Sequence, residues 1–367
     1  MKTLLYILAL ASVLFASAED IASCKKCHPT IASEFETSMH KKATIYEDKV
    51  HAAIWDKHPA KAKDNYNCAA CHTPNATEEK VSHEGVTCIS CHTIKSVEKH
   101  AARNKNVYAK DKHTLFSAEK GRETELVKYK TTTSWWGNKT TIGSAYHDID
   151  YTNEDYYTGE MCMGCHSHKQ NAHKFDVCRT EEAGAKTEKE NCITCHMPKI
   201  LGTATTVRLS KTHAYHGFAG ARVEPRMLAK YVEFNFKKSA KGFDLTLHNK
   251  APHDLMSHPL RVVQLRTTLI RGTKHTKLKT HSFVRQIGHE GKPSMPWLAT
   301  EIVKSNMIKA NEKRLVAFEQ ALQSGDKVEV VLGFYIVNPK VLKKLNLEDD
   351  KEINKFTVLK SQHFSVE

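Results

Sequence analysis

One pentapeptide pattern, C-x-x-C-H, occurs five times in this sequence of 367 residues. The two thiols of such a motif can each form a thioether to a haem vinyl group, and the following histidine can bind the iron as its proximal ligand. A thioredoxin-like site has a single C-x-x-C, and a zinc ribbon has no fixed trailing histidine, so neither alternative explains the pattern. The sequence therefore predicts five covalently bound haem c groups. The thioether cysteines are Cys24, Cys27, Cys68, Cys71, Cys88, Cys91, Cys162, Cys165, Cys192 and Cys195, and the proximal histidines are His28, His72, His92, His166 and His196.

The N-terminal residues have the pattern of a cleavable export signal. Lys2 precedes an apolar run over residues 4–10, and Ala16-Ser17-Ala18 has the small residues of a cleavage site. The apolar run is too short to span a membrane. We therefore expect a signal peptide over residues 1–18, a mature chain from Glu19 and a periplasmic location, which is where haem is attached to such motifs.

The formal net charge of the chain is strongly positive, but bound haem would reduce the net charge of the protein. Lys plus Arg number 55 against 41 Asp plus Glu, a formal net charge of +14. Haem propionates would neutralise much of this charge, so it does not indicate nucleic-acid binding.

Ten of the 11 cysteines belong to the motifs, and Cys178 remains. We expect Cys178 to be a buried thiol packed against a haem, with a reactive thiol as the alternative.

The periodicity of the sequence changes after the last motif. Up to about residue 225 only brief helical patterns occur, at 31–36 and 50–57, because porphyrins would supply the apolar core. After Pro225, apolar and polar residues alternate with the period of half-buried strands, as in Val232, Phe234 and Phe236. Residues 239–242 have the composition of a hairpin loop, and 341–355 predict a short helix or edge segment. We therefore predict a mostly α and irregular multihaem cytochrome domain over 19–225, followed by an all-β, sandwich-like domain over 226–367.

Local patterns around the motifs resemble those of a known family. They are Ser38-Met39-His40, Glu84-Gly85-Val86-Thr87, Ser144-Ala145-Tyr146-His147, Val177-Cys178-Arg179-Thr180, Met197-Pro198, His216-Gly217-Phe218-Ala219-Gly220, Met227-Leu228, Asn249-Lys250-Ala251-Pro252-His253 and Pro259-Leu260-Arg261. In these patterns the chain is similar to the multihaem c-type cytochromes of the cytochrome c-552/c-554 family, which are relatives of hydroxylamine oxidoreductase. The chain departs from them by having a fifth motif. It also lacks the C-x-x-C-K motif of the pentahaem nitrite reductases and a tyrosine that matches the cross-linking one of hydroxylamine oxidoreductase.

The sixth ligand of each iron decides whether that haem is closed or open to substrate. Eighteen of the 23 histidines lie outside the motifs, which is more than enough to close every site. The resemblance implies that His40, His147, His216 and His253 are distal ligands. His100 is our fifth candidate, in competition with His58, His83 and His173. If His253 is a ligand, the β domain is joined firmly to the haem domain.

Two functions fit these features. The first is an electron carrier between a membrane quinol dehydrogenase and a terminal reductase or other acceptor. The second is an oxidoreductase of small nitrogen or sulfur oxyanions at one five-coordinate haem, where basic residues attract the anion. Peripheral contact with a membrane is compatible with either function.

Trp135-Trp136 lies in the long insertion between the third and fourth motifs. We expect this pair to pack on a porphyrin as a loop anchor, with a partner surface as the alternative.

Overall fold

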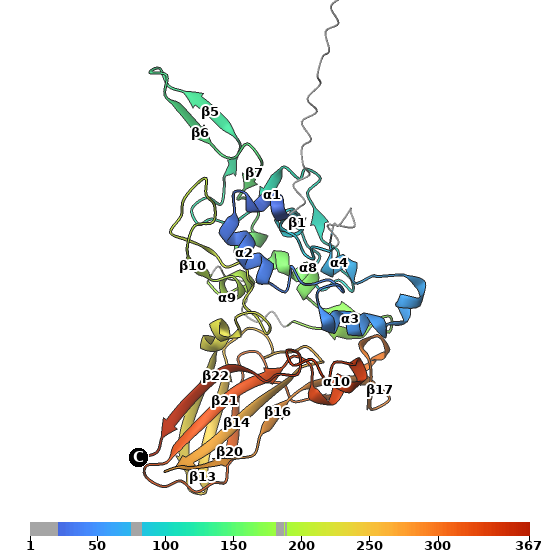
Figure 1. Cartoon of the computed structure of the whole chain (residues 1–367), viewed down its shortest axis with the longest axis vertical. Helices are drawn as coiled ribbons and strands as arrows, with labels where there is room; N and C mark the ends of the chain where they lie inside the picture. Colours follow the sequence, from blue (N-terminus) through green and yellow to red (C-terminus); the bar gives the residue numbers. More distant parts are fainter. Residues whose placement is uncertain (1–20, 75–82, 181–186, 188) are drawn as a thin grey trace, which may run out of the picture.

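The computed structural model describes residues 21–74, 83–180, 187 and 189–367 (Figure 1). The expected signal peptide, residues 1–18, and the expected mature start at Glu19 lie outside the described residues. Among the described helices, none is both long and apolar enough to cross a membrane.

Each C-x-x-C-H motif folds around one short helical turn. Positions i, i+3 and i+4 lie on one face of such a turn, so the two thiols and the imidazole point to the same side. Side chains cap several of these turns: Thr87 accepts from the backbone of Ser90, and Asn191 forms a capping box with Thr194. The helical segments of this region are α1 (Ile21–Lys25), α2 (Pro29–Thr37), α3 (Lys49–Asp56), η1 (Pro59–Lys63), α4 (Ala69–His72), α6 (Cys88–His92), α7 (Asp155–Thr158), η2 (Glu160–Cys162), α8 (Met163–His166) and α9 (Cys192–His196).

Short strands connect these helical turns. Strands β3, β7 and β4 form a small sheet in the order β3-β7-β4, and β5 and β6 form a separate hairpin that extends away from the rest of the haem region (Figure 1). Neither was expected from the sequence. The strands are β1 (Ile94–Ser96), β2 (Val107–Tyr108), β3 (Thr114–Phe116), β4 (Leu126–Val127), β5 (Lys130–Thr133), β6 (Lys139–Ile142), β7 (Asp148–Asp150), β8 (Lys169–Gln170), β9 (Asp176–Cys178), β10 (Lys199–Leu201) and β11 (Thr212–Ala214).

The C-terminal region is built from antiparallel strands. One sheet has the order β12-β13-β20, and a second has the order β15-β14-β21-β22 with β16 also paired to β14. Ser239 pairs with Gly242 across the tight turn between β12 and β13, as the loop composition predicted. The elements are η3 (Pro225–Tyr231), β12 (Val232–Ser239), β13 (Gly242–Asn249), β14 (Val262–Arg271), β15 (Lys274–Lys277), β16 (His281–Phe283), β17 (Arg285–His289), β18 (Lys292–Pro293), η4 (Pro296–Leu298), β19 (Glu301–Ser305), β20 (Lys313–Phe318), β21 (Lys327–Tyr335), α10 (Pro339–Leu345) and β22 (Thr357–Ser365).

The two larger sheets bury one shared hydrophobic core. Leu245 and Leu247 of β13 are fully buried, as are Leu265 of β14 and Val330 of β21. Alternate residues of these strands point into the core, which is the period-two pattern that the sequence shows. Two sheets packed face to face over such a core have the layer arrangement of a β-sandwich.

The β region contacts the haem region through several independent groups. Val50 and Ala53 of α3 belong to the same buried cluster as Leu342 and Leu345 of α10. The buried Arg285 side chain donates to the carbonyl oxygens of residues 176 and 177, at 2.6 and 2.8 Å. The side-chain amide of residue 171 donates to the carbonyl oxygens of residues 296 and 299, at 2.8 and 2.6 Å. The β region is therefore held against the haem region by both apolar and polar contacts.

Candidate haem sites

The motif histidines are oriented by backbone carbonyls. We number the five sites in motif order, from site 1 with Cys24, Cys27 and His28 to site 5 with Cys192, Cys195 and His196. At four sites Nδ1 of the motif histidine donates a hydrogen bond to a carbonyl oxygen, which leaves Nε2 free to bind a metal. The pairs are His28 with Ala204 at 2.8 Å, His72 with Ala43 at 2.7 Å, His92 with Phe116 at 2.7 Å and His196 with Ala219 at 2.6 Å.

At four sites a second imidazole faces the motif histidine. A metal–imidazole bond is about 2.0 Å long, and a ring nitrogen lies about 1.1 Å from the ring centre, so two imidazoles on opposite sides of one iron have centres about 6.2 Å apart. The observed separations match this value. They are 6.2 Å for His28 and His147, 6.4 Å for His92 and His216, 5.8 Å for His166 and His40, and 6.2 Å for His196 and His253.

The facing histidines also have the chemistry of iron ligands. Nδ1 of His216 and of His253 donates to a carbonyl oxygen, at 2.7 and 2.9 Å, so Nε2 is again the free nitrogen. Burial lowers the pKa of His40 to about 3 and that of His216 to about 4, which keeps both rings neutral and able to ligate. Nδ1 of His40 is buried and has no hydrogen-bond partner within the described chain. The donor sets of these four sites fit haem iron.

Site 2 differs from the others. The ring of His51 lies 4.1 Å from that of His72, which is too close for an iron between them. Nδ1 of His51 donates to the Ala43 carbonyl, and the Tyr66 hydroxyl lies 3.2 Å from its Nε2. Among the described residues, His51 is the histidine whose ring contacts that of His72, and it does not lie at an iron-spanning distance. Sequence reasoning missed His51, because it lies inside an ordinary amphipathic helix pattern.

His100 lies beside the fourth motif. Its ring is 4.5 Å from that of His168, and its backbone N–H donates to the Ser167 hydroxyl. The structure therefore pairs His100 with a second non-motif histidine, and its role as a distal ligand stays a prediction. The competing residues also have other neighbours: His83 stacks on Tyr46 at 3.8 Å, and His58 lies beside Trp55.

Two arginines lie near Asp48, at the start of the helix that carries His51. Asp48 caps α3 and accepts a hydrogen bond of 2.7 Å from Arg222. Burial lowers the pKa of Arg261 to about 10, and the nearby charges of Arg222 and Asp48 also act on it. Asp48 acts in turn on the pKa of His72, which burial lowers to about 4. Asp48 therefore connects both guanidinium groups electrostatically to site 2.

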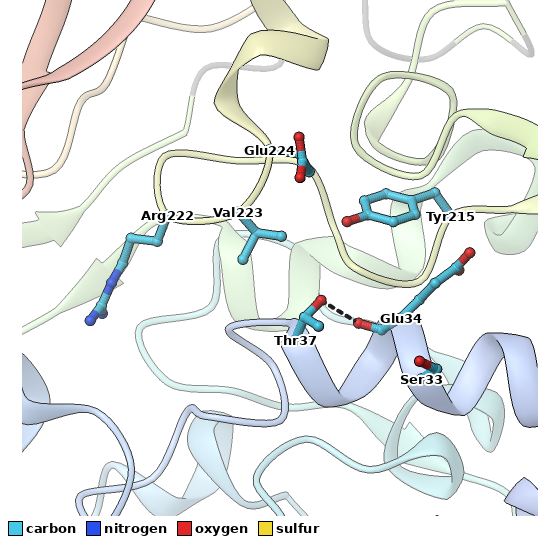
Figure 2. A pocket seen from close by; sticks show the side chains of 7 residues that line it. All are labelled: Ser33, Glu34, Thr37, Tyr215, Arg222, Val223 and Glu224. Carbon is cyan, nitrogen blue, oxygen red and sulfur yellow. Dashed lines mark hydrogen bonds between the residues drawn. The ribbon is translucent and has the colours of Figure 1, made fainter. Parts of the chain in front are cut away.

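Glu34 of α2 organises the segment that carries His216. Its carboxylate accepts from Nε2 of the buried His213 at 2.7 Å and from the backbone N–H of His216 at 2.9 Å. Glu34 and Tyr215 also line one side of an adjacent groove of about 460 Å³, and Arg222 lies on its other side (Figure 2). Sequence reasoning did not identify Glu34, because its partners lie about 180 residues away in the chain.

Contacts between motif thiols show which sites are neighbours. Side-chain hydrogen bonds join Cys24 to Cys88, Cys71 to Cys165, and Cys162 to Cys192. Cys91 is close enough to Cys162 and Cys165 to act on their pKa values. Site 1 therefore lies beside site 3, site 3 beside site 4, and site 4 beside both site 2 and site 5.

Two single residues lie on the surface of the protein part of the molecule. Cys178 lies on β9 opposite Lys169 and is exposed to the protein surface, so a haem and not protein would have to cover it; its packing on a haem stays a prediction. Trp135 and Trp136 are 94% and 84% exposed at the tip of the β5–β6 hairpin, which extends away from the rest of the haem region, so the expectation of a loop anchor is wrong. The strands of this hairpin have no apolar alternation by which the sequence could reveal them.

Comparison with known proteins agrees with this geometry. Residues 23–93, which include the first three motifs, match the family model described as cytochrome c554 and c-prime. The chain is similar to the multihaem c-type cytochromes of this family. No curated protein matches the sequence. A penta-heme cytochrome c552 from Thermochromatium tepidum has a similar fold, with a TM-score of 0.70 over 94% of this chain and 97% of that chain at 20% identity.

Proposed function

We propose that this cytochrome is a periplasmic pentahaem electron carrier between a quinol-linked membrane donor and a terminal reductase or other acceptor. Each haem, once bound, supplies one-electron redox chemistry. The motif cysteines would hold the haems by thioethers, and the motif and facing histidines would bind the irons. The similarity to multihaem c-type cytochromes supports the electron-transfer role, and the donor and acceptor classes are part of the same proposal.

The observation that carries the proposal is the set of four opposed histidine pairs. Separations of 5.8–6.4 Å suit two axial imidazoles on one iron. An iron with two protein ligands has no position for substrate, and it exchanges electrons without changing its ligands. A protein that closes most of its irons in this way is suited to carry electrons.

The order of the sites supports the same function. The thiol contacts support a continuous row of sites 1, 3, 4 and 5, with site 2 beside site 4. His147 belongs to site 1, and His253 brings the β region to site 5. The two ends of the row therefore differ. This suits a protein that accepts electrons from one partner and delivers them to another.

Low-temperature EPR of the air-oxidised holoprotein tests this assignment. We expect four of the five irons to be low-spin and insensitive to added nitrite, hydroxylamine or sulfite. Stepwise reduction should also show electron exchange among all sites. Two or more high-spin irons in the wild-type protein would contradict the four opposed pairs.

A second function is favoured by site 2 alone. If no histidine lies across the iron from His72, that iron keeps one position for a small ligand. Arg222 and Arg261, whose charges lie near Asp48 beside this site, are the cationic side chains that would attract a nitrogen or sulfur oxyanion to it. We propose reduction or oxidation of such an anion as the alternative function, with the other four sites supplying or removing electrons.

Ligand titration separates the two functions. Nitrite and sulfite are anions at neutral pH, whereas hydroxylamine is mostly uncharged and serves as the matched control ligand. Under the second function, nitrite shifts one high-spin signal, and Arg261→Gln weakens nitrite affinity several-fold while hydroxylamine affinity changes little. A spectrum that none of these ligands shifts would remove the second function and leave the carrier.

A further inference from the structure

The β5–β6 hairpin presents two tryptophans at its tip. Gly137 N–H donates to the Ser134 carbonyl at 2.9 Å, and Gly137 has a φ of +77°. This is the type I turn followed by a left-handed residue that closes many three-residue hairpin loops. Trp135 and Trp136 occupy the central positions of the turn, so they are the outermost residues of the hairpin. Figure 1 shows the hairpin extending from the haem region at the end opposite the β region.

The hairpin buries none of its residues in this protein. Every residue of β5 and β6 is exposed, and the two indoles are 94% and 84% exposed. A lone two-stranded hairpin is marginally stable in water, and adjacent exposed tryptophans are rare on a soluble surface. The tip therefore has the properties of a contact site whose partner lies outside the chain.

The composition of the hairpin identifies the class of partner. Residues 126–147 contain no Asp or Glu, and they include Lys128, Lys130 and Lys139. Tyr129 and Tyr146 are also exposed, by 51% and 78%. Trp and Tyr rings flanked by Lys, without acidic residues, are the composition of segments that lie at the interface of an anionic bilayer.

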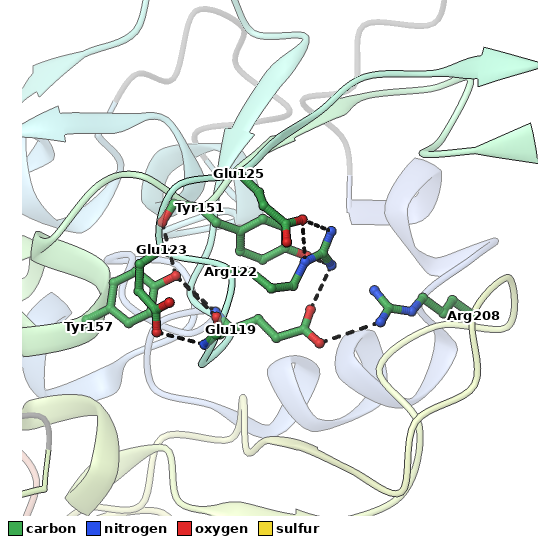
Figure 3. A network of polar contacts seen from close by, with 8 residues as sticks. Glu119, Arg122, Glu123, Glu125, Tyr151, Tyr157 and Arg208 are labelled. Carbon is green, nitrogen blue, oxygen red and sulfur yellow. Dashed lines mark hydrogen bonds and ion pairs between the residues drawn. The ribbon is translucent and has the colours of Figure 1, made fainter.

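The root of the hairpin is held firmly to the haem region. Strand β4 enters the hairpin and β7 leaves it, and the two pair antiparallel at Leu126 with Asp150. Arg122 bridges Glu119 and Glu125 and lies 4.3 Å over the Tyr151 ring (Figure 3). Arg208 reaches the same Glu119 from the loop next to site 1. These contacts fix the root of the hairpin relative to the haem region.

We propose that this hairpin docks the cytochrome onto an anionic lipid bilayer, with Trp135 and Trp136 at the headgroup level and the lysines on lipid phosphates. His147 lies five residues after the end of β6 and faces His28, so the docked hairpin directs site 1 toward the membrane. The membrane end of the site row is then the end that receives electrons from a membrane donor. The bilayer contact itself stands whether the protein is a carrier or an enzyme.

A protein partner fits the hairpin less well. The tip is convex, its strands carry short threonine side chains, and all its charge has one sign. A planar anionic surface needs no complementary pocket, whereas a specific protein partner usually buries a hydrophobic core within a larger interface. A second copy of this chain remains as an alternative occupant, and the oligomeric state in solution tests it.

Flotation of the holoprotein with lipid vesicles tests the proposal. The vesicles are phosphatidylglycerol with phosphatidylethanolamine, and phosphatidylcholine alone serves as the neutral comparison. We expect binding to the anionic vesicles that weakens as salt rises, and a loss of about tenfold or more when Trp135→Ser and Trp136→Ser are combined. Leu315→Ser is the matched control, because Leu315 is a 61% exposed apolar residue of the β region.

Tryptophan fluorescence locates the contact. Of the four tryptophans, Trp55 and Trp297 both contact His58, whereas Trp135 and Trp136 lie exposed at the hairpin tip. Brominated lipids should quench the tip emission, and Lys130→Gln with Lys139→Gln should flatten the salt dependence.

Three results would overturn the proposal. The first is equal vesicle binding by the wild type and the double tryptophan variant. The second is absence of binding to anionic vesicles, or equally strong binding to phosphatidylcholine. The third is a dimer in sedimentation that the double variant abolishes, which would assign the tip to a second copy of this chain.

Discussion

The replacement His253→Ala tests whether the β region supplies an axial ligand. His253 faces His196 at 6.2 Å with the rings 21° from parallel, and its Nδ1 is held by the Asp254 carbonyl. Removing the imidazole takes one ligand from one of five irons. The high-spin fraction of the ferric protein should therefore rise by one fifth of total iron, whatever the state of site 2.

The effect should be confined to that iron. Thioethers from Cys192 and Cys195 would retain the haem, and the β region stays docked through Arg285 and the α3–α10 cluster. Each of these hydrogen bonds contributes about 1 kcal/mol, so losing one ligand does not release the interface. His253→Met is expected to close the iron again and to raise its potential, because Met/His haems have higher potentials than bis-His haems.

Quantitative EPR of the oxidised proteins is the assay, with His248→Ala as the control. His248 lies on β13 near Glu233 and faces no motif histidine among the described ring contacts. An unchanged high-spin fraction in His253→Ala would refute the ligand assignment. A rise in both variants would point instead to general loosening of the β region.

Three further results are expected. Glu34→Ala should lower the free energy of unfolding by about 1–3 kcal/mol in chemical denaturation, because it leaves buried donors around His216 unpaired. Leu245→Ala should cost about 2–5 kcal/mol in the same measurement, since Leu245 is fully buried. The hydrogen bond from Arg271 lowers the pKa of Asp326 to about 2, so this pair stabilises the fold above pH of about 4 and is lost as pH falls toward 2. Arg271→Gln should therefore raise the pH midpoint of acid unfolding followed by circular dichroism.

Much of the β region was predictable because its strands bury one face. The alternation of Val232, Phe234 and Phe236 marks β12, and the fully buried residues of β13 and β21 follow the same period. The tail prediction was also correct, since α10 begins after the Asn338 cap. Local burial and local capping leave a signal in neighbouring residues, and that signal can be read without the structure.

The β5–β6 hairpin and the ligand pairs left no such signal. The hairpin buries neither face, so its threonines and lysines show no apolar alternation. The partner of each motif histidine depends on packing between segments far apart in the chain, as for His28 and His147. Spacing alone predicted the proximal ligands, whereas the facing histidines were expected only from the family resemblance. His51 carried no distinguishing pattern at all.

The longest segment between motifs joins two neighbouring sites. Cys91 of site 3 lies near Cys162 and Cys165 of site 4, so the 69 residues between these two motifs are not needed to reach the next site. This segment instead contains both the hairpin and His147. Because β7 pairs with β4 at the root, replacing residues 130–142 by a short Gly-Ser turn should leave His147 in place and the low-spin content unchanged. Loss of one low-spin iron in that deletion would mean that the hairpin itself positions the ligand of site 1.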